Sequence, residues 1–529
     1  MGRSALTDIC FVFMVHQPFR LNRNFLRDLF ELGRLTDRAR LEKYFDHSLN
    51  REVFERVAQR CYLPANEAIL EAIDRHRDDV RRVEVAYSLS GVFLEQCERY
   101  RPDVLESFRS LAETGCVEFL NQTYYHSLAS LFSASRGEFI EQVKMHRELI
   151  RSVFKYEAKT FENTELIYNN SIAATVRHLG FEVMLIEGAA RALGGRPPNY
   201  LYRAKSVDLR LLPRNYQLSD DIGFRFSSRS WEEWPLLSEK YAAWLSATPG
   251  ECINIFLDYE TFGEHHWPET GIHGFLRALP EQVLAHPNLR FSVPSRLGLS
   301  LSPVGEVDVG DYDTTSWADL ERDTSAWLGN SLQRNAYERV KALEPLVRQA
   351  GSLELLTLWR YLQVSDHFHH MSTKGGGAGD VHSYFSPFSS ALEAYTAYSS
   401  VLADLEHRVA EALATPARLA ARRLQTVPEE KAFIFSEGFA KPMGIRASSL
   451  AELSWKLLGV PLGSVEFHAR RGDFERWVRD VLQDDELAEN LRSISLKGLR
   501  GEALRDAILK ALNDEVERLT KLAASESQR

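Results

Sequence analysis

The sequence predicts an α/β fold in which a parallel sheet closes, or nearly closes, into a barrel. In the first 300 residues, short apolar runs alternate with longer segments of helical period. A repeated strand–helix–strand order is typical of parallel sheets with helical crossovers, and the many repeats favour a barrel over an open sheet. After residue 315 the pattern becomes almost wholly helical, which indicates a second domain.

The predicted strands are short and often β-branched or aromatic, as strands buried on both faces are. They are residues 9–15, 83–88, 116–120, 158–161, 183–186, 209–212, 253–257 and 289–292. Helical period lies between most of them, at residues 51–76, 93–114, 136–154, 171–179 and 272–285.

Two changes of pattern divide the rest of the chain. Residues 300–315 are loop-like and rich in Gly, Pro, Asp and Ser. Helices are then expected at residues 319–327, 334–350, 353–364 and 389–412. A second break at 415–430 precedes one strand-like start, KAFIFSEGF, and further helices. We therefore expect a barrel at 1–305, a helical domain at 306–415 and a small accessory module at 425–529.

Charge and composition exclude several classes of partner. Lys and Arg number 64 against 74 Asp and Glu, so the net charge is −10 and offers no attraction to nucleic acid or anionic membranes. No apolar run approaches a membrane span, and the N-terminal run is too short for a secretion signal. The five cysteines are widely spaced without a CxxC motif, as buried thiols of a reducing compartment are. The expected location is the cytoplasm; the oligomeric state is open.

Polar side chains follow four of the predicted strands, where parallel α/β folds place their sites. The segments are HQPFR, NQTYYHSL, ENTELIYNN and DYETFGEHHW. Each has a purely structural alternative: His16 as a half-buried histidine, Glu118 as a buried partner for an arginine, Glu165 as a helix N-terminal acid, and EHHW as an exposed loop. All four would have to coincide at one face of one sheet, so together they indicate a functional site.

The residue types in these segments suit carbohydrate chemistry. Two carboxylates on separate strand ends can attack the anomeric carbon and protonate the leaving oxygen of a glycoside. Sugar rings also pack their apolar faces on aromatic rings, while their hydroxyls bind carboxylates, amides and imidazoles. Aromatic residues near the strand ends are Tyr124, Tyr125, Tyr168, Tyr259 and Trp267. Aromatics are also common core residues, so this signal is weak by itself.

Four ordered motifs, HQPFR, GCVEFL with YYHSL, FENTELIYNN and IFLDYETFGEHHW, resemble the first four sequence regions of glycoside hydrolase family 57. SWADLERDTSAWLGN and SDHFHHMSTKGGGAGDVHSYFSPF resemble the downstream region of its α-amylase-type members. The resemblance covers residues 8–405. It implies an incomplete (β/α)7 TIM-like barrel, a helical domain that completes the site, and a retaining reaction on an α-glucan or maltooligosaccharide without a cofactor or metal. The last hundred residues resemble a helical domain of unknown function.

By motif matching, the resemblance assigns Glu165 as the nucleophile and Asp258 as the acid/base. If so, we expect their carboxyl groups to face one cavity about 5–6 Å apart. The remaining candidates are expected to bind substrate: His16, Gln17, Glu118, Tyr125, His126, Glu264, Trp267, Asp366 and His367. Asp366 could instead pair with Arg360 at a helix end. Gly375–Gly379 is expected to form a mobile lid.

Three other functions stay open. A 4-α-glucanotransferase would use the same scaffold. A metal-dependent hydrolase would use ligand-type residues, namely His265, His266, Asp366, His367, His369 and His370. Their spacing, however, is not the i, i+4 helix-face pair with a third carboxylate that zinc hydrolases use. A non-catalytic carbohydrate-binding protein would lack the nucleophile, whereas Glu165 is present.

Overall fold

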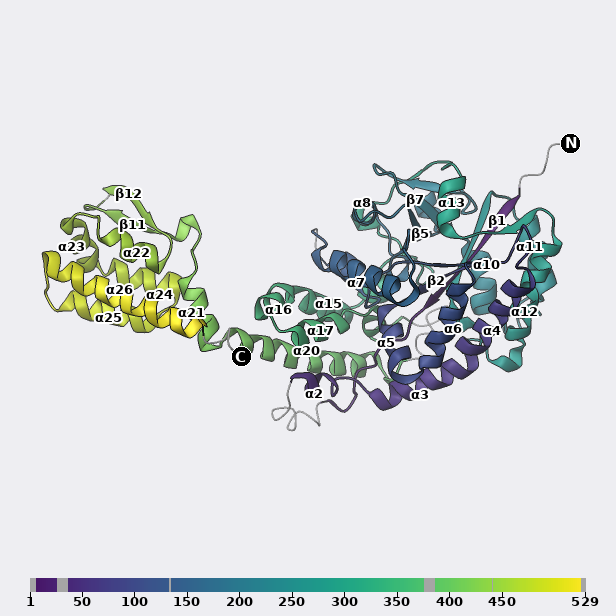
Figure 1. Ribbon diagram of the computed structural model, residues 1–529, viewed down its shortest axis with the longest axis horizontal. Coiled ribbons are helices and arrows are strands. Elements are labelled where there is room, and N and C mark those ends of the chain that lie inside the picture. The colour runs from purple at the N-terminus through teal and green to yellow at the C-terminus, as the bar shows by residue number, and fades with distance from the viewer. Residues whose placement is uncertain (1–5, 26–36, 133–134, 375–385, 440, 525–529) are drawn as a thin grey trace. The chain divides into compact units, whose positions relative to one another are not determined.

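The computed structural model describes residues 6–25, 37–132, 135–374, 386–439 and 441–524. The chain divides into two compact units, Met1–Leu405 and Glu406–Arg529 (Figure 1). Each unit is described by itself. Among the described residues, no helix has the length and apolar character that crossing a membrane requires.

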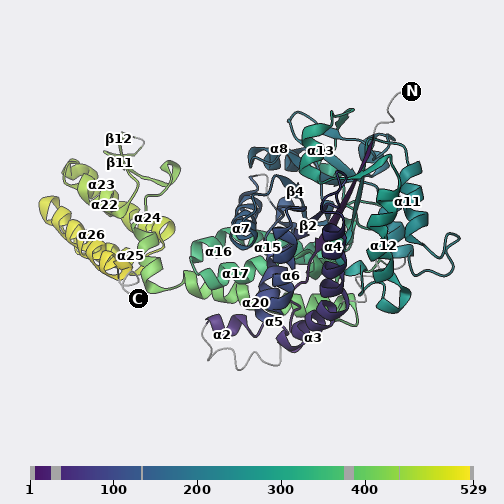
Figure 2. The same ribbon diagram turned by 45° about the vertical axis from the view of Figure 1, so that its right-hand side comes forward.

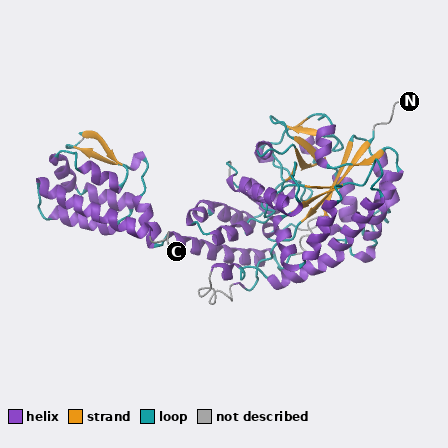
Figure 3. Ribbon diagram, in the orientation of Figure 1, coloured by secondary structure: helices purple, strands orange, loops and turns teal. Residues whose placement is uncertain are grey.

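Among the described residues of the first unit, seven parallel strands follow one another in a barrel-like order; strands are orange in Figure 3. In that order they are β1 (Thr7–Val15), β2 (Val85–Leu89), β3 (Val117–Phe119), β4 (Thr160–Glu162), β5 (Val183–Glu187), β7 (Arg210–Arg214) and β8 (Cys252–Asp258). Ladders join most neighbours, and the longest runs between β1 and β8. Two seams are weaker: β3 meets β4 through the single bridge Asn121–Phe161, and β7 meets β8 through the single pair Arg214–Asn254. The predicted α/β class with a TIM-like barrel is confirmed.

Every predicted barrel strand is present, and the eighth apolar run forms β9 (Leu289–Phe291) beside the start of β1. Two short strands were not predicted, β6 (Tyr202–Ala204) and β10 (Glu306–Val307). β6 runs antiparallel to β7 and pairs with β10. Both are too short and too polar to give an apolar run, so only tertiary pairing reveals them.

The barrel interior is filled by alternate residues of its strands, because successive side chains of a strand point to opposite faces. Cys10, Val12 and Met14 of β1 meet Cys252 and Phe256 of β8 there. The outer face is covered by helices (Figure 2). These are α3 (His47–Val57), α4 (Leu63–Arg75), α5 (Gly91–Tyr100), α6 (Pro102–Glu113), α7 (Gly137–Phe154), α8 (Asn170–His178), α11 (Ser238–Ala247) and α12 (Ile272–Ala285). Shorter helices are α2 (Asp37–Leu41), α9 (Ala190–Leu193), α10 (Tyr216–Asp220) and α13 (Pro294–Ser300).

Prolines divide two helices that the sequence predicted as continuous. The expected helix at 93–114 is α5 and α6, separated at Pro102, because proline lacks an N–H and fits the first turn of a new helix. The expected helix at 334–350 is likewise divided at Pro345. The segment 51–76 comprises α3 and α4, joined by a π-helical turn at Ala58–Tyr62.

The region after residue 315 is helical, as predicted. It contains α14 (Ser325–Leu328), α15 (Ser331–Ala342), α16 (Glu344–Ala350), α17 (Leu353–Tyr361), α18 (Ser365–His369) and α20 (Ala391–Leu413). The expected helix at 319–327 is largely wrong, because Asp319 and Arg322 have positive φ and only the end of that segment is helical. Arg360 of α17 reaches Glu138 of α7 at 2.8 Å, which ties these helices to the barrel.

The second unit has its own apolar core, which includes Phe433, Phe435, Trp477 and Leu512. Its elements are α21 (Pro416–Leu424), β11 (Phe433–Ser436), β12 (Pro442–Ala447), α22 (Leu450–Leu457), α23 (Leu462–Arg471), α24 (Asp473–Leu482), α25 (Asp485–Leu496) and α26 (Gly501–Ala524). β11 was predicted and forms an antiparallel hairpin with β12, which was not.

Candidate active site

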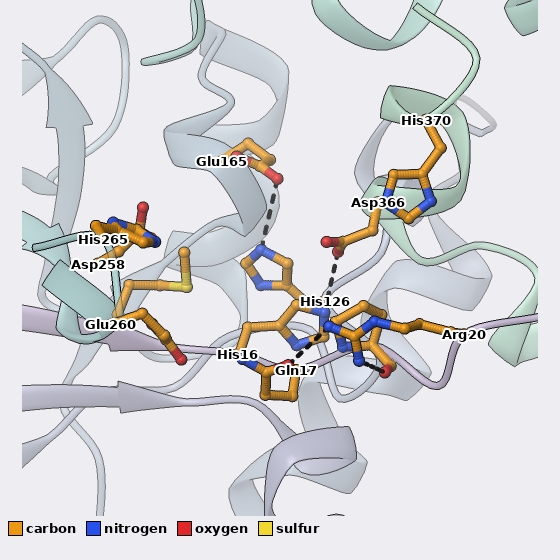
Figure 4. Close-up of a pocket in the computed structure, with 12 residues that line it drawn as sticks. His16, Gln17, Arg20, His126, Glu165, Asp258, Glu260, His265, Asp366 and His370 are labelled. Carbon is orange, nitrogen blue, oxygen red and sulfur yellow. Dashed lines mark hydrogen bonds and ion pairs between the residues drawn. The ribbon is translucent and has the colours of Figure 1, made fainter. Parts of the chain in front are cut away.

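A pocket lies at the carboxyl ends of the barrel strands, next to α18. Its lining includes six residues that the sequence predicted as site residues: His16, Gln17, His126, Glu165, Asp258 and Asp366. They follow β1, β3 and β4, end β8 or lie on α18. Figure 4 shows their side chains around one cavity. The remaining lining residues are Met14, Pro18, Arg20, Glu260, His265 and His370.

Glu165 is buried, and three donors from separate segments face its carboxylate. Trp317 donates its indole N–H to Oε2 at 2.6 Å, and Ser365 donates its hydroxyl to Oε1 at 2.9 Å. Nε2 of His126 lies 3.6 Å from Oε1. Hydrogen bonds to a carboxylate favour its charged form. These contacts therefore favour the anion of Glu165 and fix the orientation of its side chain.

The backbone at Glu165 is strained. Glu165 has φ +59° and Leu166 has φ +51°, so two consecutive residues with side chains are in the left-handed region. Such a conformation costs about 1–3 kcal/mol per residue and persists only where surrounding contacts impose it. Here the backbone N–H of Trp317 also donates to the backbone carbonyl of Glu165 at 3.1 Å. The turn after β4 therefore aims the Glu165 side chain into the pocket.

Asp258 ends β8 and has the opposite electrostatic environment. Burial raises its pKa well above the ordinary range, and the nearby carboxyl groups of Glu260 and Glu165 raise it further. A raised pKa favours the protonated form of a carboxyl group, which can donate its proton. Figure 4 shows Asp258 and Glu165 entering the same pocket. The surroundings thus favour the anion at Glu165 and the protonated form at Asp258.

Glu260 is a second protonatable carboxyl in the pocket, and the sequence prediction omitted it. Tyr62 donates its hydroxyl to Glu260 at 2.5 Å, and burial raises the pKa of Glu260 to about 7. The DYETFGEHHW motif contains both Glu260 and Glu264, and the prediction chose Glu264. In the structure, Glu264 is buried away from the pocket lining and pairs with Arg56 at 2.8 Å. Spacing alone did not distinguish the two residues.

His16 and Asp366 form a pair across the pocket. His16 Nε2 donates to Asp366 at 3.1 Å, and His16 Nδ1 accepts from Ser90 at 2.7 Å, so this network assigns the Nε2–H tautomer. Burial and the neighbouring His126 lower the pKa of His16 to about 4. Burial alone would raise the pKa of Asp366, but the His16 hydrogen bond and nearby histidines lower it well below the ordinary range. A neutral imidazole therefore faces an aspartate anion.

The alternative pairing of Asp366 with Arg360 does not occur, because Arg360 binds Glu138 and Glu141. A different arginine, Arg20, lines the pocket instead. Its guanidinium is buried and donates to Gln17 Oε1 at 3.0 Å. Arg20 belongs to the HQPFR motif, so a charged residue next to predicted site residues was the signal that could have identified it.

Five predicted substrate-binding residues are outside the lining of this pocket. They are Glu118, Tyr125, Glu264, Trp267 and His367. Glu118 is within β3, as the predicted strand at 116–120 implies, and its carboxylate accepts from Thr160 Oγ1 at 2.5 Å and from the Ser295 N–H at 2.9 Å. Ser295 belongs to α13, so Glu118 instead joins the barrel strands to that helix.

The other four have different surroundings. The Tyr125 ring packs against Tyr361 with centroids 5.0 Å apart, and Trp267 is half-exposed beneath the Arg60 guanidinium. His367 is buried near Tyr398. The predicted lid, Gly375–Gly379, lies outside the described residues. Within the described ranges, no three His, Cys, Asp or Glu side chains are grouped as metal ligands would be.

Comparison with known proteins identifies relatives of both units. Residues 10–310 match the family described as "Glycosyl hydrolase family 57", and residues 429–529 match a family of unknown function, DUF5752. A putative alpha-amylase of Methanocaldococcus jannaschii is 45% identical over 414 residues, which are 77% of this chain and 85% of that protein. A 4-alpha-glucanotransferase of Thermococcus litoralis is 25% identical over 26% of this chain and 19% of its own.

Two solved structures share the fold. The crystal structure of the Thermococcus litoralis 4-alpha-glucanotransferase superposes with a TM-score of 0.54 at 16% identity and covers 82% of this chain. This chain spans 62% of that protein, which is less than two thirds. A branching enzyme from Thermococcus kodakaraensis gives a TM-score of 0.52 at 13% identity, over 77% of this chain and 94% of its own.

Proposed function

Because the chain belongs to glycosyl hydrolase family 57, we propose that it is a retaining, α-amylase-like enzyme that cleaves α-1,4-glucans or maltooligosaccharides. Glu165 is the proposed nucleophile and Asp258 the proposed acid/base. The observation that carries this proposal is the contrast between the surroundings of two carboxyl groups that line one pocket. Three donors face Glu165 and favour its anion, whereas burial and neighbouring carboxyl groups favour the protonated form of Asp258.

The two states match the two halves of a double displacement. Glu165 attacks the anomeric carbon while the Asp258 proton passes to the glycosidic oxygen, so the C–O bond breaks and a glycosyl ester forms. Asp258, now ionised, then takes a proton from an incoming hydroxyl whose oxygen attacks the same carbon. The ester bond breaks, and Glu165 returns to its carboxylate. Water as the incoming molecule gives hydrolysis, and a sugar hydroxyl gives transfer.

The remaining pocket groups are suited to binding sugar hydroxyls. Asp366 supplies an anionic acceptor, Arg20 a cationic donor, and His16 and Gln17 neutral polar groups. Charged and amide groups of this kind orient hydroxyls, because hydrogen bonds to charged partners are stronger than neutral ones. Relatives whose names state activity on α-glucans, an alpha-amylase and a 4-alpha-glucanotransferase, support an α-glucan as the substrate.

Asp366→Ala tests the binding role. The variant removes the anionic acceptor but leaves His16 Nε2–H free to bind water in the open pocket. We expect kcat/KM on maltooligosaccharides to fall about 10- to 100-fold, which corresponds to the loss of a charged hydrogen bond. The unfolding free energy should change by less than about 1 kcal/mol. A large loss of stability, with normal kinetics in the folded fraction, would make Asp366 a structural residue.

Product analysis with maltoheptaose tests the reaction. The enzyme should release shorter maltooligosaccharides whose new reducing ends are first α-anomers, because two displacements retain configuration. Chromatography gives the chain lengths, and polarimetry or NMR gives the anomer. A ladder of products longer than maltoheptaose would identify a glucanotransferase. Loss of activity on chelation would favour the metal-dependent hydrolase, and initial β-anomers or no cleavage would contradict the proposal.

A further inference from the structure

Glu162 is a buried carboxyl group that ends β4, three residues before Glu165, and is not part of the pocket lining. Its side chain has no exposed surface. Ser88 donates its hydroxyl to Oε2 at 2.9 Å, while Oε1 is buried without a hydrogen-bond partner among the described residues. Burial raises the pKa of Glu162 to about 7. Burying a carboxyl group costs free energy, so an apolar side chain at this position would stabilise the folded state more.

A chain of hydrogen bonds links Glu162 to His126. Ser88 Oγ, which donates to Glu162, accepts from Gln122 Nε2 at 2.9 Å. Gln122 Oε1 accepts from His126 Nδ1 at 2.8 Å, and the other ring nitrogen of His126 faces Glu165 (Figure 4). The side chains in this hydrogen-bonded series are each at most 1% exposed, so bulk water does not replace any of these contacts; they are Glu162, Ser88, Gln122 and His126.

The direction of each hydrogen bond in this chain depends on the next, and two arrangements couple the charge of Glu162 to His126. When Glu162 is ionised, Ser88 donates to it, the Gln122 amide donates to Ser88, and the Gln122 carbonyl requires a proton on His126 Nδ1. When Glu162 is protonated on Oε2, it donates to Ser88 and every bond reverses. The Gln122 amide is then turned over, and His126 Nδ1 is an acceptor.

We propose that Glu162 is a positioning residue whose charge, relayed through Ser88 and Gln122, sets whether His126 faces Glu165 as an imidazolium or as a neutral imidazole. Passing from the first form to the second moves one proton from His126 to Glu162, and the pair stays neutral overall. The inference rests on the proposed role of Glu165. An anionic Glu165 favours the imidazolium. A glycosyl ester at Glu165 removes that charge and favours the neutral form.

The surroundings of His126 support this assignment. The charged or titratable groups that face it are Glu162, Glu165, Asp258 and Asp366, together with His16, whose ring stacks on His126 at 4.3 Å. Burial lowers the pKa of His126, but the contact and charge of Glu165, followed by the charges of Glu162 and Asp366, outweigh burial and raise it. Neutral His16 adds no competing positive charge.

Glu162→Gln is the decisive variant, because a glutamine at this position has no charge to balance an imidazolium, and the relay predicts that its amide N–H donates to Ser88. NMR of protein carrying ¹⁵N-labelled histidine reports the protonation of each ring nitrogen, and the His126→Gln variant identifies the signals of His126. In the wild type at pH 7, both ring nitrogens of His126 should carry protons. In Glu162→Gln, the ring should be neutral with its proton on Nε2. Unchanged ring shifts would overturn the proposal.

Two further variants separate the hydrogen-bonded chain from a simple effect of charge. Ser88→Ala removes the hydroxyl that donates to Glu162, so it should also make His126 neutral at pH 7, and Glu162→Gln should add nothing in that background. An unchanged His126 in Ser88→Ala would overturn the relay. Glu84→Gln removes a buried carboxylate held by Arg82 and Arg296, outside the chain. It should leave the His126 signals as in the wild type.

Kinetics give a separate readout. In Glu162→Gln, kcat should fall about tenfold with KM within about twofold, because a neutral His126 still contacts Glu165 but without charge assistance. A rise in KM at unchanged kcat would contradict a role directed at Glu165. The NMR result needs no substrate, so failure of the proposed function and failure of this inference are distinguishable.

Discussion

Glu165→Gln should abolish nearly all activity on every substrate. The amide has the shape of the carboxylate but cannot form the glycosyl ester, and losses of this kind are about 10⁴-fold or more in kcat. The measurement is kcat on maltoheptaose and on an aryl α-glucoside with an activated leaving group. Both should fall to a similar extent, because both reactions need the same attack on the anomeric carbon.

The fold should survive this change. Glu165 already has a strained backbone and a buried charge, so a neutral side chain does not remove a stabilising core contact. Thermal unfolding of the variant should therefore resemble that of the wild type. A residual activity above about a tenth of the wild-type value, in a folded protein, would assign the nucleophile to another residue.

Asp258→Asn should instead separate substrates by their leaving groups. Natural glucans release an alcohol that needs a proton, so kcat/KM on maltoheptaose should fall about 10²- to 10⁴-fold. An activated aryl group leaves as a stable anion, so formation of the glycosyl ester from that substrate should fall far less. Added azide, which attacks without a general base, should then restore turnover and give a glycosyl azide.

Glu260→Gln is the matched comparison for Asp258→Asn. Both residues line the pocket, and burial raises the pKa of each carboxyl group. Only the acid/base should show the dependence on leaving group and the rescue by azide. If Glu260→Gln shows this signature and Asp258→Asn loses both substrates equally, Glu260 is the acid/base.

The sequence predicted the barrel well because its strands are buried on both faces and therefore appear as uninterrupted apolar runs. It predicted the position of the site because polar residues after such runs are conspicuous. Glu118 is inside its strand, as predicted, but its carboxylate binds Thr160 and the Ser295 N–H, and no local pattern indicates these contacts. Pro102 is the local signal that divides α5 from α6, because proline fits the first turn of a new helix.

Other features depend on contacts between distant segments. Trp317 and Ser365 donate to Glu165 across separations of 152 and 200 residues, and no local pattern announces either contact. Ser88 and Gln122 were not among the candidate site residues, since each alone is an ordinary buried polar residue. Their importance follows from the hydrogen bonds that join them, which exist only in the folded chain.

The two weak seams of the barrel have a consequence for catalysis. They divide the barrel into two half-barrels, one made of β8, β1, β2 and β3 and the other of β4, β5 and β7, each internally joined by ladders. Asp258 ends β8 in the first half-barrel, and Glu165 follows β4 in the second. The spacing of these carboxyl groups is therefore set by single bridges and by side chains that cross the seams. Heat or substitutions that weaken the contacts at these two seams would impair the proposed reaction before either half-barrel unfolds.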